Sequence, residues 1–142
     1  MSRDLRSDCP IAAGLDIFGD RWTLLILRDM LLGGKSHYGE FATDESVASN
    51  ILADRLAALV HLGIIERVPD PEDGRKFIYR PLEPAIELLP AIAEIAAWGV
   101  KYTDIAVPTE MQPMADPSAR RQMVSRMTKE LSKQIALYDT NT

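Results

Sequence analysis

The segment from Ile11 to Leu32 is mostly apolar and is interrupted by Gly19-Asp20-Arg21-Trp22. Pro10 precedes it, and proline suits the first turn of a helix, where its missing N–H would have had no partner. Apolar residues recur at helical spacing up to Phe18, and the glycine that follows is typical of a helix end. The segment therefore predicts two short helices that pack at an angle around Trp22.

The second of these helices carries apolar residues on more than one side, which predicts a helix largely enclosed by others. Arg21, Arg28 and Asp29 mark the side that we expect to be solvated. Trp22 is interpreted as a core anchor, and Gly33-Gly34 ends the helix.

With 142 residues, the chain is expected to form one domain of ordinary size. Its apolar runs stay below the roughly 18 to 20 residues that a membrane span requires, so a membrane is not an expected partner. The charged N-terminus lacks a signal-type apolar region, and the single cysteine suits a reducing compartment. We therefore expect a cytoplasmic protein.

A helix, a turn and a longer helix are predicted next. Residues 36–41 predict a short helix that sets Tyr38 and Phe41 into a core, and residues 42–46 form a polar turn. The longer helix should begin near Ser46 or Val47 and end at Gly63, with an apolar stripe at three- and four-residue spacing. Its polar residues lie off the stripe and should face outward. This order outlines a helix-turn-helix, in which the start of the second helix reaches base edges.

A β-hairpin follows directly. Residues 64–68 and 77–80 predict two strands, joined by a loop that contains the strong turn signal Asp73-Gly74. The hairpin is interpreted as a wing whose tip carries Arg75 and Lys76. Both cations are placed to touch phosphates or a minor groove, although neighbouring acidic residues weaken the positive potential.

A long helix is predicted from Ala85 to about Tyr102, and Pro84 and Pro90 can separate its first turns from the rest. It carries two apolar stripes, of which one needs a second surface, most simply a partner chain. Residues 107–117 contain three prolines and predict a linker, after which Ser118 caps an amphipathic helix. We expect residues 1–106 to form a DNA-binding and dimerisation domain, and residues 107–142 a linker and C-terminal helix, which either packs on a chain or forms a loosely held tail.

These motifs together resemble the HxlR-type family of bacterial winged helix-turn-helix regulators. The resemblance runs in order from residue 9 to about residue 102. It rests on Cys9-Pro10, Leu15-Asp16, Gly19, residues 21–29 (Arg-Trp-Thr-Leu-Leu-Ile-Leu-Arg-Asp), Tyr38-Gly39-Glu40-Phe41, residues 52–56 (Leu-Ala-Asp-Arg-Leu) and residues 63–67 (Gly-Ile-Ile-Glu-Arg).

The resemblance implies a mainly α fold with a small β-hairpin wing, and a homodimer on an operator of two-fold character. Dimerisation in such proteins uses the N-terminal helix and the long helix after the wing. The chain departs from the family pattern at Val47-Ala48-Ser49-Asn50, where the recognition helix commonly begins with Ile-Ser, and at residues 79–84 after the wing. On the N-terminal helix and the long helix after the wing, the resemblance implies these dimer-interface residues: Ile11, Leu15, Leu88, Ile92, Ile95, Gly99 and Tyr102.

The net charge of −5 argues mildly against nucleic acid, but a local positive edge matters more than the total. Asn50 suits the edge of adenine, and the alternative is that it and Ser49 only solvate the helix start. Arg55 either anchors a phosphate or pairs with Asp54 or Glu66. The predicted DNA-binding residues are Ser36, Tyr38, Ser49, Asn50, Ala53, Arg55, Arg75 and Lys76.

Cys9 is the candidate for redox sensing. Near a helix N-terminus the dipole favours its thiolate, with Arg6 assisting and Asp8 opposing, and some proteins that resemble this chain sense oxidants with a cysteine at this place. The alternative is a small buried hydrophobe. His37 and His61 are isolated, so no metal or cofactor is expected, and no catalytic motif is recognised.

The sequence therefore predicts a homodimeric, sequence-specific DNA-binding transcriptional regulator. We expect a repressor rather than an activator, and not an enzyme. A redox, electrophile or small-molecule signal is compatible with it. The alternative is a winged-helix scaffold that binds proteins or small molecules without binding DNA.

Overall fold

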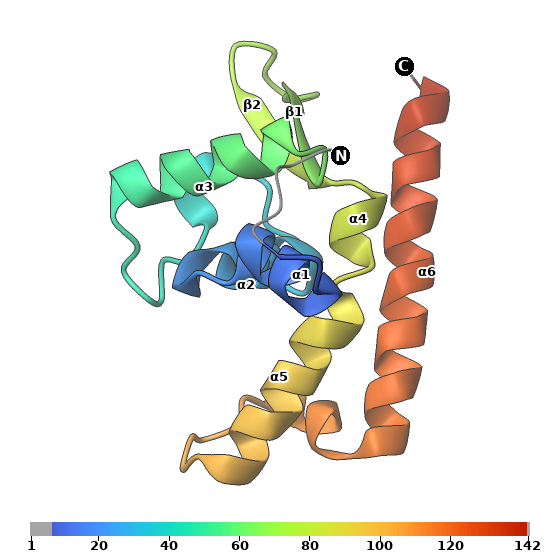
Figure 1. Ribbon diagram of the computed structural model, residues 1–142. Coiled ribbons are helices and arrows are strands. Elements are labelled where there is room, and N and C mark those ends of the chain that lie inside the picture. Colours follow the sequence, from blue (N-terminus) through green and yellow to red (C-terminus); the bar gives the residue numbers. More distant parts are fainter. Residues whose placement is uncertain (1–6, 142) are drawn as a thin grey trace. The chain divides into compact units, whose positions relative to one another are not determined.

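The computed structural model describes residues 7–141 and divides the chain into two compact units, of which the first ends at Ala85 and the second begins at Ile86. The first unit is helical apart from one antiparallel hairpin (Figure 1). Its elements are α1 (Pro10–Phe18), α2 (Arg21–Leu31), the 3-10 helix η1 (Tyr38–Glu40), α3 (Ser49–His61), β1 (Ile65–Pro69) and β2 (Phe77–Pro81), and the short α4 (Glu83–Ile86) spans the boundary. The order of helices and wing confirms the predicted winged helix-turn-helix fold.

The break between α1 and α2 has a clear physical basis. The N–H of Gly19 donates to the carbonyl of Leu15 and closes α1. Asp20 then caps α2: its Oδ2 accepts from the N–H groups of Trp22 at 2.9 Å and Thr23 at 3.0 Å. A carboxylate at this position satisfies donors that the helix itself leaves without partners.

Helix α2 forms the centre of the core, together with the buried side chains of Phe41, Leu56 and Leu59. Two expectations for this helix were wrong. Asp29 is only 7% exposed rather than solvated, because its carboxylate is used inside the fold. Trp22 is half-buried and does not belong to the core, and the guanidinium of Arg21 lies 5.3 Å from its ring centroid.

Helix α3 begins at Ser49, later than the predicted start at Ser46 or Val47. The chain before it turns through two residues of positive φ, Ala42 at 51° and Ser46 at 57°. The N–H of Val47 donates back to the carbonyl of Ala42 at 3.3 Å, which prolongs the turn. Ala48 occupies the N-cap position and offers no side-chain acceptor.

The end of α3 directs the chain into the wing. Gly63 has a φ of +74°, its N–H donates to the carbonyl of Val60, and that of Ile64 donates to the carbonyl of Leu59. This pair of hydrogen bonds is a Schellman motif, which requires the left-handed conformation that glycine adopts without strain. The strands pair antiparallel, from Ile65 opposite Pro81 to Pro69 opposite Phe77, within a residue of the predicted bounds.

The second unit contains α5 (Leu89–Tyr102), the 3-10 helix η2 (Thr109–Ala115) and α6 (Pro117–Asn141). Pro90 lies in the first turn of α5, and α4 is a separate short helix, as the prolines predicted. The segment expected to be a linker contains η2, whose Met114 is fully buried. No helix between residues 7 and 141 combines the length and apolar character of a membrane span.

Helix α6 is capped by Asp116, whose Oδ2 accepts from the N–H of Ala119 at 2.8 Å, and not by Ser118 as expected. Arg120 fixes the start of α6 to its neighbours. Its Nε donates to Glu94 of α5 at 2.9 Å, and its Nη1 donates to the carbonyl of Met114 in η2 at 2.7 Å.

Candidate nucleic-acid interface

The exposed face of α3 carries short, small or polar side chains. Leu52, Leu56 and Leu59 point into the core, as the apolar stripe predicted. The residues off the stripe are all exposed: Ser49, Asn50, Ala53, Asp54 and Ala57. A helix that fits a major groove needs such a face, because bulky side chains would hold its backbone away from the base edges.

Tyr38 contacts the start of α3, and Ser36 contacts the wing. The phenolic O–H of Tyr38 donates to the carbonyl of Ser49 at 2.8 Å, so the ring, which is 37% exposed, is fixed against the start of α3. The carbonyl of Ser36 accepts from the N–H of Tyr79 in β2 at 2.8 Å. The structure thus joins Tyr38 to Ser49 at the start of α3, and joins Ser36 to the middle of strand β2.

The turn before α3 is held by charged groups from α2. Arg28 donates from Nη1 and Nη2 to the two carboxylate oxygens of Glu45 at 2.9 and 2.8 Å. Its hydrogen bond lowers the pKa of Glu45. The buried carboxylate of Asp29 accepts from the N–H of Ala42 at 2.6 Å and from the Nε of Arg28 at 2.9 Å. These contacts fix both ends of the turn that sets the position of α3.

Arg55 is engaged within the chain. Its Nε donates to the Oδ2 of Asp20 at 3.0 Å, and its Nη1 donates to Asp54, one of the two partners that the sequence suggested. Partial burial is the largest influence on the pKa of Asp20 and raises it, but hydrogen bonds from Thr23, Arg55 and Trp22 together lower that pKa. The other suggested partner, Glu66, accepts from Arg80 at 2.6 Å.

The wing tip presents its cations to solvent. Arg75 is 92% exposed at its side chain, and its Nε lies 3.2 Å from the Oδ1 of Asp73. Arg75 lowers the pKa of that carboxyl. Lys76 is also exposed. Both side chains can reach a ligand, but the nearby carboxylate of Asp73 partly offsets the positive charge of Arg75.

Sequence reasoning missed an ionic clasp at His37. Its Nε2 lies 2.9 Å from the Oδ2 of Asp70, and its Nδ1 lies 3.2 Å from the Oε1 of Glu40. The hydrogen bond that His37 donates to Asp70 raises the pKa of His37, although desolvation opposes the shift, and Glu40 adds to it. Asp70 is 33 residues away in the chain, so sequence proximity could not have found the pair.

A second missed feature lies on the wing surface. The guanidinium of Arg67 lies 3.6 Å from the ring centroid of Phe77, in cation–π contact, and both residues are exposed. The alternation of strand side chains could have placed Arg67 on the outer face.

The charge of the helix-turn-helix and wing is negative. Residues 36–80 contain five basic and eight acidic side chains. Three of these cations, Arg55, Arg75 and Arg80, already lie against carboxylates. Phosphate attraction over this segment is therefore weak for a DNA-binding surface.

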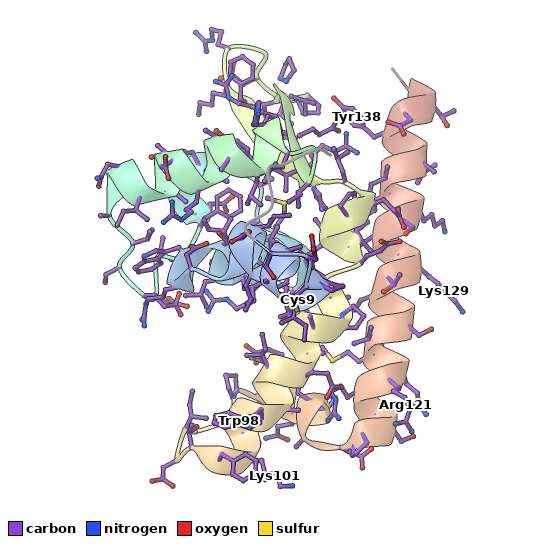
Figure 2. All side chains as sticks on the ribbon, viewed as in Figure 1. Cys9, Trp98, Lys101, Arg121, Lys129 and Tyr138 are labelled. Carbon is purple, nitrogen blue, oxygen red and sulfur yellow. The ribbon has the colours of Figure 1, made fainter. Side chains whose placement is uncertain are left out.

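Large apolar side chains are exposed on α1 and on α5. Ile11 is 74% and Leu15 is 54% exposed on α1. On α5, Ile95 and Tyr102 are exposed, and so is Trp98, which the sequence analysis did not select. Figure 2 shows Trp98 on the side of α5 away from α6.

Three predicted interface residues on α5 and before it are less accessible. Leu88 and Gly99 are half-buried, and Ile92 is only 7% exposed. The side chain of Ile92 is thus enclosed by its own chain rather than offered to a partner. Trp98, by contrast, extends the exposed strip and contacts Tyr102, with ring centroids 5.2 Å apart and the ring planes tilted by 43°.

Cys9 is exposed and occupies the N-cap position of α1, without a side-chain capping hydrogen bond. Arg6, which was expected to assist its thiolate, lies outside the described residues. Between residues 7 and 141, no group of three or more His, Cys, Asp and Glu side chains is arranged to hold a metal ion.

A cleft of about 450 Å³ opens in the first unit, among the end of α1, the start of α2 and the C-terminal half of α3. Its size lies within the range of small-molecule sites. The lining is mixed, with Leu15, Leu59 and Leu62 as apolar walls and Asp20 and Arg55 as charged groups.

Comparisons with known proteins place the chain in a family. Residues 17–106 match the model of the HxlR-like helix-turn-helix family. An uncharacterized HTH-type transcriptional regulator of Mycobacterium tuberculosis, MT3179, is 36% identical over 92 residues, which are 65% of this chain and 58% of the relative. The chain thus spans less than two thirds of that relative's length. YdeP of Bacillus subtilis, also named an HTH-type transcriptional regulator, is 31% identical over 104 residues, covering 72% of this chain and 80% of YdeP.

Solved structures agree with this assignment. The crystal structure of PA1607 is similar with a TM-score of 0.63 and 38% identity, over 73% of this chain and 70% of that one. The reduced form of the transcriptional regulator YodB from B. subtilis gives a TM-score of 0.55 and 27% identity, over 71% of this chain and all of YodB. With the family model matching well over half of its residues, the chain belongs to the HxlR-like helix-turn-helix family.

Proposed function

We propose that the protein is a sequence-specific DNA-binding transcriptional regulator that acts as a homodimer on an operator. The observation that carries the proposal is the exposed start of α3, where Ser49 and Asn50 face solvent and Tyr38 fixes the backbone at Ser49. An exposed asparagine on a recognition helix matches the hydrogen-bonding edge of adenine. The relatives named as transcriptional regulators support the same role.

The proposed interface assigns different tasks to its residues. Ser49, Asn50 and Ala53 lie against base edges, with Ser36 and Tyr38 beside the adjoining phosphates. Arg75 and Lys76 contact phosphates or enter the minor groove from the wing, since both are exposed at its tip. Arg55 keeps its ion pairs with Asp20 and Asp54 and reaches a phosphate with its remaining N–H groups.

Homodimerisation is part of the proposal. The exposed apolar side chains of α1 and α5 form surfaces that water solvates poorly, and a second copy is the simplest partner for both. Residues 1–106 would then bind DNA and dimerise, while residues 107–142 form an additional segment outside the family match. Two recognition helices in one dimer call for half-sites one helical turn, or a multiple of it, apart.

We further propose repression as the sign of regulation. A dimer that lies in two major grooves covers promoter DNA that polymerase would otherwise contact. Deletion of the gene should raise transcription from the bound promoter, and a fall would contradict repression while leaving DNA binding intact.

The DNA-binding proposal is tested by fluorescence anisotropy with two duplexes of equal length, one from the region upstream of its own gene and one of random sequence. We expect tighter binding to the upstream duplex, weakening steeply as salt rises. Failure to bind either duplex at low salt would contradict the proposal. It would favour the second candidate, a winged-helix scaffold for protein or small-molecule ligands, which the acidic balance of residues 36–80 supports.

We also propose that a chemical signal controls the DNA binding of this protein. Cys9 is exposed beside the apolar face of α1, and the similar YodB structure is described as a reduced form. Alkylation of Cys9 by an electrophile, exchange with a small-molecule disulfide to give a mixed disulfide, or oxidation by an external two-electron oxidant to a disulfide with the second copy's Cys9 would each alter that face. The cleft lined by Leu15 and Arg55 offers an alternative place for a small-molecule effector.

Treatment with N-ethylmaleimide tests the cysteine. We expect it to weaken operator binding by the wild-type protein and to leave Cys9→Ser unaffected. Equal affinity of treated and untreated wild-type protein would contradict a sensing role for Cys9 while leaving DNA binding intact.

A further inference from the structure

The long helix α6 has a strongly basic side that the helix-turn-helix fold does not require. Residues 117–141 contain five basic and two acidic side chains, in a chain that has 16 basic and 21 acidic residues in total. The helix also lies beyond residue 106, where the family match ends. Its charge is therefore opposite to that of the rest of the protein and is specific to this additional segment.

Four of these cations form what we call the basic stripe: Arg121, Arg126, Lys129 and Lys133. All four are exposed and line one surface of α6 together with Gln122, Ser125 and Glu130. Arg126, Lys129 and Lys133 are spaced by three and four residues, so these cations lie on one face over about 10 Å of helix axis. Figure 2 shows Arg121 and Lys129 on the side of α6 that points away from α5.

The stripe does not serve the fold of its own unit. Arg120, the fifth cation, forms the ion pair with Glu94 and binds the carbonyl of Met114. Within residues 7–141, by contrast, no carboxylate lies within ion-pairing distance of the four stripe cations. The apolar residues of α6 lie on the opposite side and are half-buried: Met123, Met127, Leu131 and Ile135. The stripe cations thus face outward, with Glu130 as the acidic side chain beside them.

We propose that the basic stripe of α6 binds the phosphate backbone of duplex DNA and supplies much of the electrostatic affinity that the acidic helix-turn-helix and wing lack. This inference rests on the proposed function. Duplex DNA carries one phosphate per about 3.4 Å on each strand, so a row of about 10 Å can neutralise up to three of them. The polar residues among the cations disfavour insertion into a lipid surface, which needs exposed apolar side chains beside the charges.

The contact would be independent of base sequence, because lysine and arginine on phosphates position a protein without reading bases. The stripe should therefore strengthen operator and random DNA alike. It would leave discrimination between the two to α3.

The test compares the salt dependence of binding for the wild type and for the variant Arg126→Gln, Lys129→Gln, Lys133→Gln, on the upstream and random duplexes. Each lost phosphate contact lowers the slope of log K against log salt by about 0.9. We expect the slope to fall by about one to three per chain, and affinity for both duplexes to fall by a similar factor of at least ten at low salt. An unchanged thermal unfolding curve checks that α6 is intact.

Two controls separate a local contact from net charge. The variant Thr109→Glu, Gln112→Glu, Ala115→Glu changes the net charge equally, at exposed positions of η2, and should lower the slope far less. The variant Arg126→Lys, Lys129→Arg, Lys133→Arg should bind as the wild type does.

If the wild type binds the operator but the neutralised variant keeps the same salt slope, the inference about α6 is contradicted and the proposed function is not. If the neutralised variant loses binding to anionic lipid vesicles but binds DNA as the wild type does, the inference is also contradicted, and the stripe is assigned to a membrane surface. Failure of the wild type to bind either duplex would contradict both this inference and the proposed function.

Discussion

The Nε2 of His37 lies 2.9 Å from the Oδ2 of Asp70, and this contact joins the residue before η1 to the residue after β1. Asp70 also accepts from the N–H of Glu72 and donates its own N–H to the carbonyl of Lys76, so it organises the loop of the wing. The wing is thereby tied to the helix-turn-helix by an imidazole whose pKa is raised by its hydrogen bonds to Asp70 and Glu40.

Removal of this clasp should destabilise the first unit more at low pH than at high pH. Asp70 and Glu40 raise the pKa of His37, so the protonated ring is favoured in the folded state. Its contribution is complete below the ordinary pKa of 6.5 and is lost as the pH rises through the raised value. The difference in Tm between the wild type and His37→Gln should therefore be larger at about pH 5.5 than at about pH 9.

Asp70→Asn provides the matched control, because it removes the same contact from the other side. We expect it to reduce the pH dependence as His37→Gln does, and the double variant to add little. A difference in Tm that grows towards high pH would show that the clasp does not act through protonated His37.

The buried carboxylate of Asp29 should be important for the turn before α3. Asp29→Ala leaves the N–H of Ala42 without its acceptor in the core, which costs about 1–3 kcal/mol in the free energy of unfolding. Asp29→Asn keeps an acceptor oxygen and should cost less. Asp44→Ala, at an exposed acid of the same turn, is the control. Urea denaturation measures all three, and an equal cost at Asp29 and Asp44 would refute the assignment.

Gly63→Ala should destabilise the junction of α3 and β1. The position has a φ of +74°, where a Cβ costs about 1–2 kcal/mol. Gly74→Ala makes the comparison, since that glycine lies outside the left-handed region and its added Cβ would meet open space. We expect a lower Tm for Gly63→Ala and little change for Gly74→Ala. Similar Tm values for the two variants would exclude a conformational role for Gly63.

Trp98→Asp should weaken the proposed homodimer. A tryptophan at the centre of an interface contributes about 2 kcal/mol or more, which corresponds to a roughly 30-fold higher dissociation constant. Leu137→Asp is the control, because Leu137 is similarly exposed, at 55%, but lies on α6. Sedimentation equilibrium measures both. If Trp98→Asp associates as the wild type does, the exposed face of α5 is not the dimer interface.

The sequence predicted those parts of the fold that local patterns determine. Gly19, Gly63 and the apolar stripe of α3 located helix ends and faces because capping and periodicity act over a few residues. The delayed start of α3 at Ser49 was not predictable, since it depends on two residues in a left-handed conformation.

Contacts between distant residues explain the remaining differences. Asp29 was expected on the solvated side of its helix. Its burial depends on the N–H of Ala42, 13 residues away, which donates to the carboxylate together with the Nε of Arg28. The pairing of Arg55 with Asp20 spans 35 residues and was likewise missed. Residues at the start of α3 were recognisable from the motif order alone, and whether they contact DNA stays a prediction.

We propose that α3 reads the base sequence, whereas Arg75 and Lys76 of the wing add affinity without discriminating between sequences. The most direct measurement is the ratio of affinities for the upstream and random duplexes, in Ser49→Ala, Asn50→Ala and in Arg75→Ala, Lys76→Ala. Each good pair of hydrogen bonds to a base contributes about 1–3 kcal/mol of discrimination. We predict that the α3 variant loses about tenfold or more of the ratio with random-duplex affinity preserved, whereas the wing variant weakens both duplexes and keeps the ratio. An α3 variant with an undiminished ratio would contradict the account.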